Sequence, residues 1–62
     1  MMPQSPLSKR IARTALDMIR DFGGTAVIDA HEAANAARMA GDKEDEAFYL
    51  AVVRKIEEFY GR

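Results

Sequence analysis

His31 is the one histidine of the chain and the first residue that could bind a metal ion. Asp29, Glu32 and Asn35 are near it in the sequence and carry oxygen atoms that could serve as further ligands. Structural zinc takes about four nitrogen or sulfur ligands, and the chain has no cysteine and no second histidine. We therefore predict a solvated surface histidine and no metal site, with a ligand shared between symmetric subunits as the alternative.

A cluster of carboxylates could bind calcium and comprises Asp42, Glu44, Asp45 and Glu46. A calcium loop needs glycine at its sixth position and a bidentate glutamate at its twelfth, but Ala47 and Val53 stand there. The same charges suit the positive end of a helix. Asp42 can accept a hydrogen bond from the backbone N–H of Asp45 and so cap that helix. We predict a helix start rather than a calcium site.

The sequence pairs no nucleophile with a base. The hydroxyl candidates fall at or near predicted helix starts or on a charged face, and they are Ser5, Ser8, Thr14 and Thr25. The pair Gly23 and Gly24 lacks the lysine and the spacing of a phosphate-binding loop. Three short helices also leave little volume for a pocket of about 300 Å³. We therefore predict that the protein is not an enzyme and takes no cofactor and no small-molecule substrate.

Helices must position these residues, and they are predicted over residues 6–22, 26–40 and 43–60. Pro6 after Ser5 suits a helix start, and Thr25 could cap the second helix. Gly23 and Gly41 end the first two helices, because glycine adopts positive φ without a Cβ penalty. The short second turn makes the helices on either side of it antiparallel neighbours or sharply crossed ones.

The three predicted helices carry different apolar faces. On the first helix, an arc of about 180° is wider than one neighbour covers, so that helix should contact two others. The second helix has an alanine seam made of Ala26, Ala30, Ala33, Ala37 and Ala40. The third has an arc of about 140° made of Phe48, Tyr49, Val52, Val53, Ile56, Phe59 and Tyr60. Ile28 and Met39 lie outside the seam and either cover the edge of the bundle or form a second contact surface.

An alanine-rich helix cannot fully cover both of the other apolar faces. Half-exposed large side chains would cost several kcal/mol, at roughly 25 cal/mol per Å² of apolar area. We therefore predict a homodimer, with a different protein as the alternative cover. The predicted interface comprises Leu16, Ile19, Phe48, Tyr49, Leu50, Phe59 and Tyr60. Leu50 lies outside the main arc, so it is either an isolated surface leucine or the edge of that contact.

The predicted fold class is all-α, with three helices, short turns and a helical bundle completed by homodimerisation. Residues 1–5 form a disordered lead-in and residues 6–62 a single three-helix domain. A domain of 62 residues is only marginally stable unless a disulfide, a metal or a partner subunit contributes. The absence of cysteine excludes the disulfide.

Lys9, Arg13 and Arg20 lie on one side of the first helix and could contact nucleic acid. They have no aromatic neighbour to stack on bases, and the net charge of the chain is −1. The turn at Gly41 imitates a helix-turn-helix unit, but the start of the following helix would present three acids to the phosphates. We favour a solvated helix face over a nucleic-acid contact.

The first ten residues lack the apolar run of a signal peptide. No stretch approaches the roughly 20 apolar residues of a membrane span, and a chain without cysteine is compatible with a reducing compartment. We expect a soluble cytoplasmic protein with no membrane partner.

The chain contains a series of helix-packing motifs. In sequence order they are Phe22-Gly23, an alanine-rich second helix, Ala40-Gly41-Asp42, Ala47 and then an aromatic residue, and Ile56-Glu57-Glu58-Phe59. With these motifs the chain resembles, over most of its length, a family of short uncharacterised proteobacterial proteins, a domain of unknown function. That family typically has tryptophan where this chain has Tyr49. Residues 37–51 are also similar to the middle of a tetratricopeptide repeat, but one incomplete unit cannot stack into a solenoid.

The resemblance implies an all-helical bacterial protein without an assigned activity. We predict a small non-enzymatic helical module for protein–protein interaction or regulation. The alternative is a small nucleic-acid-binding regulator that uses the basic side of the first helix.

Overall fold

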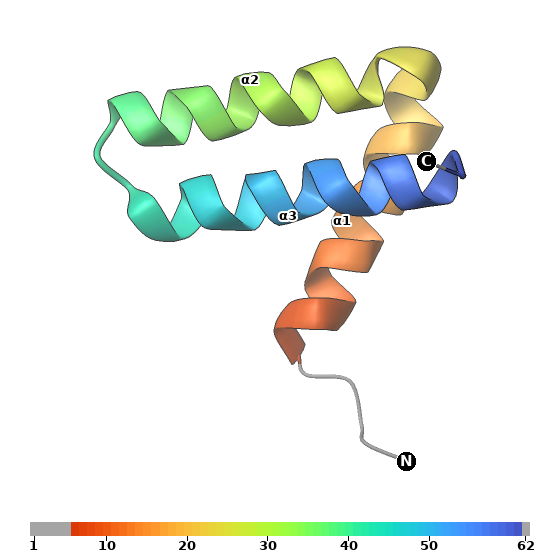
Figure 1. The fold of residues 1–62 in the computed structure, drawn as a ribbon, viewed down its shortest axis with the longest axis horizontal. Coiled ribbons are helices and arrows are strands. Elements are labelled where there is room, and N and C mark those ends of the chain that lie inside the picture. Colours follow the sequence, from red (N-terminus) through yellow and green to blue (C-terminus); the bar gives the residue numbers. More distant parts are fainter. Residues whose placement is uncertain (1–5, 62) are drawn as a thin grey trace.

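The computed structural model describes residues 6–61, and every regular element in this range is a helix. The elements are α1 (Pro6–Phe22), a short 3-10 helix η1 (Gly23–Thr25), α2 (Ala26–Met39) and α3 (Lys43–Phe59), shown in Figure 1. The predicted all-α fold is confirmed for this part of the chain, in which α2 and α3 each end one residue before the predicted position. The predicted lead-in at residues 1–5 lies outside the described residues.

α2 and α3 form an antiparallel hairpin, and α1 crosses that hairpin steeply (Figure 1). The contact between α2 and α3 is the most extensive, followed by that between α1 and α3, and α1 also contacts α2. The prediction that the first helix contacts two others is therefore confirmed. The first turns of α1 extend past α3 (Figure 1).

The turn between α1 and α2 differs in detail from the prediction. Gly23 has a φ of 58° and takes the left-handed conformation that the sequence predicted. Thr25 stands at the predicted N-cap position of α2, but its side chain forms no capping hydrogen bond, because its hydroxyl lies 3.0 Å from the carbonyl oxygen of Phe22 and 3.3 Å from a carboxylate oxygen of Asp29. Both neighbours are acceptors, so the hydroxyl donates instead of accepting from the start of α2.

The turn between α2 and α3 follows the prediction. Gly41 has a φ of 78°, which only glycine adopts without a steric penalty. Asp42 follows with extended backbone, and its carboxylate accepts a hydrogen bond of 3.0 Å from the backbone N–H of Asp45. This N-cap and the acidic first turn fix the start of α3.

The core is small and lies where the three helices meet. Its buried residues are Ala15, Ala26, Ala30, Ala34, Val52, Val53 and Ile56. Four of these seven side chains are methyl groups, and the largest that are fully buried are those of Val52 and Ile56. A core of this composition removes little apolar area from water, which limits the free energy of unfolding.

The buried alanines of α2 correct the predicted seam. Ala26 and Ala30 are buried as expected, but the third buried position is Ala34 rather than Ala33. The spacing is therefore four residues throughout, and it follows one i±4 ridge of the helix surface instead of a heptad stripe. Ala37 is half-buried, and Ala40 is exposed because it lies in the turn after α2 ends.

Candidate functional site

The residues that the sequence assigned to an interface divide into half-exposed and half-buried ones. Leu16 is 52% exposed, Phe59 48% and Tyr60 51%. Ile19, Phe48 and Tyr49 are only partly buried and pack against the core, with the rings of Phe48 and Tyr49 edge to face at 5.2 Å. Within residues 6–61, the three helices thus leave large apolar area uncovered at these positions.

Two hollows flank the crossing of α1 and α3, and both are open to solvent. One has a volume of about 410 Å³ and is lined by Leu7 and Ile11 of α1 together with Phe48 of α3. The other has a volume of about 350 Å³ and lies against Ala12 and Lys55, among other residues. Both are open depressions of the surface, so they leave the expectation of little volume for a ligand pocket untested.

Helical geometry continues this apolar region toward the end of α3. Leu16 lies one turn after Ala12 on α1, and Phe59 lies one turn after Lys55 on α3. Both side chains are about half exposed. We use the name α1–α3 surface for the incompletely buried apolar side chains that these two helices carry, namely Leu7, Leu16, Ile19, Phe48 and Phe59.

Arg10 of α1 lies beside Phe48 of this region. Its guanidinium carbon lies 4.8 Å from the centroid of the Phe48 ring, a cation–π geometry. Glu44 and Asp45 line the same hollow as Arg10. The edge of the α1–α3 surface therefore carries charges of both signs.

Leu50 lies in a different place from the other predicted interface residues. It lines a hollow of about 210 Å³ between α2 and α3, together with His31, Asn35 and Arg38. Positions 47, 48 and 51 line the hollow beside α1 instead. The structure therefore does not bring Leu50 together with Leu16, and the prediction that it forms the edge of the same contact is not supported by this placement.

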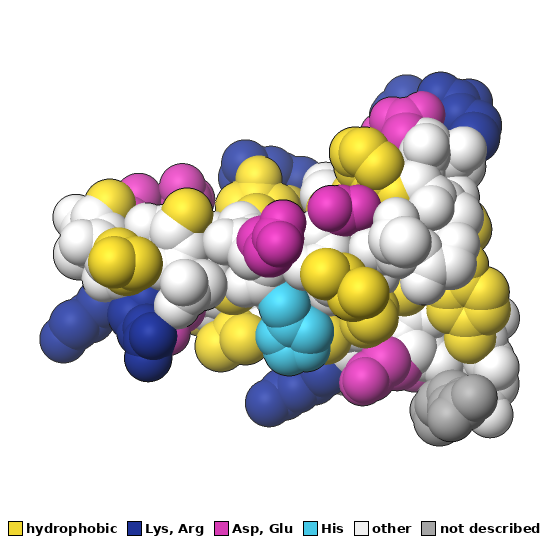
Figure 2. Space-filling view, turned by 90° about the horizontal axis from the view of Figure 1, so that it is seen from above, with side chains coloured by type: hydrophobic (Ala, Val, Ile, Leu, Met, Phe, Trp, Pro, Cys, Tyr) yellow, Lys and Arg dark blue, Asp and Glu magenta, His cyan; other side chains and the backbone are white. Residues whose placement is uncertain are grey.

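His31 is exposed on α2, on the face that Figure 2 shows. Asn35, its neighbour one turn on, accepts a hydrogen bond of 2.8 Å from Arg38, while Asp29 accepts one from Thr25. No group of three or more metal-binding side chains occurs among residues 6–61.

The outer face of α2 carries apolar side chains that form no continuous patch. Ile28 is 56% exposed and Met39 is the most exposed large apolar residue of the described chain. In Figure 2 the hydrophobic side chains on this face appear as separate groups between acidic and uncharged ones. Such separate side chains do not favour the second contact surface, which was one of the two interpretations of Ile28 and Met39 beside a cover for the edge of the bundle.

Lys9, Arg13 and Arg20 are all exposed on α1. No ion pair joins them to an acidic residue within residues 6–61, where the one salt bridge links Lys55 and Glu58. α2 and α3 lie antiparallel side by side (Figure 1), unlike the crossed pair of a helix-turn-helix unit. The nucleic-acid alternative therefore rests on the basic side of α1 alone.

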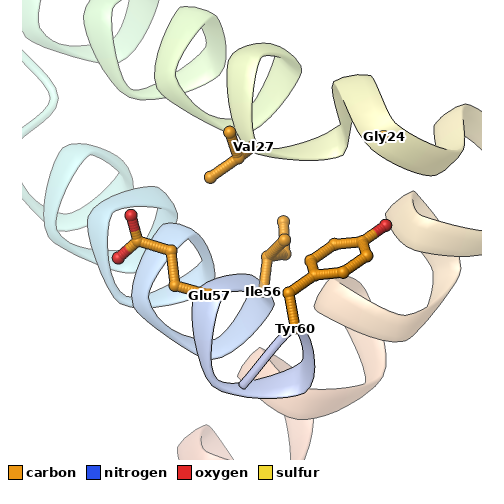
Figure 3. A pocket seen from close by; sticks show the side chains of 5 residues that line it. All are labelled: Gly24, Val27, Ile56, Glu57 and Tyr60. Carbon is orange, nitrogen blue, oxygen red and sulfur yellow. The ribbon is translucent and has the colours of Figure 1, made fainter. Parts of the chain in front are cut away.

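A fourth hollow lies where the end of α3 meets the start of α2, and Figure 3 shows its lining. Its volume is about 440 Å³, and Gly24, Val27, Ile56, Glu57 and Tyr60 line it. Val27 of α2 faces the fully buried Ile56 of α3, and the side chains of Glu57 and Tyr60 lie on either side of Ile56 (Figure 3). The hydroxyl of Tyr60 donates a hydrogen bond of 3.1 Å to the carbonyl oxygen of Gly23. Below, "the Tyr60 hollow" means this site.

The sequence did not predict the Tyr60 hollow, because its lining residues come from the region where α2 begins and from the end of α3. Tyr60 and Gly23 are 37 residues apart. No local pattern predicts such a contact, and only the antiparallel arrangement of α2 and α3 brings the end of α3 beside the turn before α2.

No family model, curated protein or solved structure matches the chain. The resemblance to short proteobacterial proteins therefore stays a prediction. Among residues 6–61, no helix combines the length and the apolar character needed to span a bilayer.

Proposed function

We propose that the protein is a small non-enzymatic helical module for protein–protein interaction, that its first partner is a second copy of itself, and that it acts in the cytoplasm. The observation that supports this proposal is the mismatch between the core and the surface. The largest fully buried side chains are Val52 and Ile56, whereas large apolar side chains such as Leu16 and Phe59 remain about half exposed.

The α1–α3 surface suits this role better than the outer face of α2. Its apolar residues come from two crossing helices, and two of them, Leu7 and Phe48, line a hollow of about 410 Å³ that can receive a protruding side chain. On α2 the exposed apolar residues are separate (Figure 2). Covering the half-exposed side chains of the α1–α3 surface would therefore remove apolar area that two helices contribute.

A second copy of the chain is the partner that fits this surface. A twofold axis lets one patch cover the same patch on the other subunit. The edge of the surface carries Arg10 beside Glu44 and Asp45, so two copies related by the axis can place opposite charges across it. The chain itself carries both charges that such an arrangement requires.

Sedimentation equilibrium over about a hundredfold range of concentration tests the proposal. We expect a mass that rises toward that of a dimer, and Leu16→Glu should weaken association by about tenfold or more. Ile28→Glu is the matched control, since Ile28 is as exposed as Leu16 but lies on the outer face of α2. Circular dichroism would verify that both variants remain helical. A monomeric mass throughout, with unfolding independent of concentration, would refute the dimer.

The nucleic-acid alternative is favoured by one observation, the exposed basic side of α1 with Lys9, Arg13 and Arg20, which forms no ion pair with another residue of the range 6–61. A regulator that uses this side should bind a generic duplex with an affinity that falls steeply as salt is added. The triple change of these residues to glutamine should abolish that binding. A protein-binding module should show no affinity for the duplex at any salt concentration.

A further inference from the structure

The hollow of about 410 Å³ beside α1 has walls of opposite charge. Arg10 stands on the α1 wall, and Glu44 and Asp45 stand on the α3 wall. All three residues are exposed. Within residues 6–61 none of them forms an ion pair, since the one salt bridge in that range joins two other residues of α3. The hollow therefore presents a cation and two anions that have no ionic partner among the described residues.

The guanidinium of Arg10 is held at this hollow by an aromatic ring. Its central carbon lies 4.8 Å from the centroid of the Phe48 ring, and Phe48 packs against the core. A guanidinium that rests on a ring can still donate through its N–H groups to a carboxylate. None of these N–H groups donates to another residue within the range 6–61. Arg10 is therefore a positioned donor, which loses little side-chain entropy when it binds.

A second copy of the same hollow carries the complement of these charges. A twofold axis beside the hollow sets the α1 wall of one copy against the α3 wall of the other, so that every contact across the axis forms twice. A partner with charges of one sign only would suit one wall and repel the other. The pair of walls therefore favours a second copy over a purely acidic or purely basic partner.

Resting on the dimer proposed above, we propose that Arg10 and Glu44 determine how two copies recognise one another, with the guanidinium of each copy donating to Glu44 of the partner subunit. Asp45, on the same wall, strengthens the negative potential that the guanidinium meets. Exposed ion pairs add little affinity by themselves. The apolar side chains of the α1–α3 surface thus supply most of the affinity, while the charges supply register and selectivity.

Charge reversal followed by mixing tests the inference in sedimentation equilibrium. Arg10→Glu sets two carboxylates against each other at both places in the dimer, and Glu44→Lys does the same with two cations. Each variant alone should associate about tenfold more weakly than the wild type, and added salt should reduce that difference. An equimolar mixture of the two variants should recover association, because the mixed pair again joins opposite charges at both places.

Two matched variants control for net charge and for helix stability. Arg13→Glu makes the first change on an exposed residue of α1 that does not line the hollow. Glu46→Lys makes the second change in the same first turn of α3, on a residue that lines the hollow beside α2. Both controls should associate within about twofold of the wild type. Circular dichroism would verify that all four variants remain helical.

The possible failures of the dimer and of its charge contacts give different results. A wild-type chain that stays monomeric would refute the dimer and this inference with it. Equal weakening by Arg10→Glu and Arg13→Glu, or a mixture that associates no better than its components, would leave the dimer in place and overturn the role of Arg10 and Glu44. Pairing of these two residues inside one chain predicts such an inactive mixture, because association between chains could not repair it.

Discussion

Replacing Ile56 with alanine should remove most of the stability of the protein. Ile56 is fully buried and belongs to the cluster that joins all three helices. The change deletes three carbon atoms, which at about 0.8 kcal/mol each correspond to about 2.4 kcal/mol of lost burial. A cavity adds to this cost, but the neighbours can relax into the adjoining Tyr60 hollow. We therefore expect a loss of about 2–3 kcal/mol, against a total of roughly 3–5 kcal/mol for a domain of this size.

Urea unfolding followed by circular dichroism at one fixed protein concentration measures this loss. Ile28→Ala is the control, because Ile28 is 56% exposed on α2 and the intrinsic preference of alanine for helices affects both variants alike. The control should change the free energy of unfolding by less than about 0.5 kcal/mol. A loss below about 1 kcal/mol for Ile56→Ala, or equal effects of the two variants, would refute the small core described above.

Three further predictions concern the turns and metal binding. Gly23→Val should lower the free energy of unfolding by about 1–2 kcal/mol because Gly23 has a φ of 58°, whereas Gly24→Val lacks that penalty; equal urea midpoints for the two variants would contradict the turn. Asp42→Ala should lower the free energy of unfolding by about 1 kcal/mol through loss of the hydrogen bond to the backbone N–H of Asp45, whereas Asp42→Asn should keep most of that stability. If both variants unfold alike, the cap contributes nothing. Chelators should leave the thermal midpoint unchanged, and a fall would reveal a metal site shared between subunits.

The helices were predictable because local sequence determines them. Asp42 and Gly41 define the start of α3 and the turn before it through chemistry within three residues, and the structure shows both interactions. Gly23 is equally local, and its positive φ was predicted. Thr25 occupies the predicted N-cap position, but the predicted side-chain cap is absent because its hydroxyl donates to the carbonyl oxygen of Phe22 and to Asp29.

The candidate sites were harder to predict because they depend on how helices cross. A helical wheel shows that Leu50 is off the main apolar arc of α3, but it does not show that Leu50 lines a hollow beside α2, together with His31 and Asn35, rather than the hollow beside α1. The predicted set of buried alanines on α2 was wrong for the same reason. Ala34 is buried because α2 packs along an i±4 ridge. Predicting the Tyr60 hollow would have required knowledge of the contact between Tyr60 and Gly23, which are 37 residues apart in the sequence.

The small core and the uncovered surface have one common cause in the composition of α2. Alanine lets the axes of α2 and α3 approach closely, which buries Val52 and Ile56 fully. The same methyl groups are too short to reach over Leu16 or Phe59, so these side chains stay half exposed. Under the proposed dimer, covering them couples folding to association. Each tenfold rise in concentration above the dissociation constant would then add up to about 1.4 kcal/mol of stability, a large fraction of what so small a core can provide.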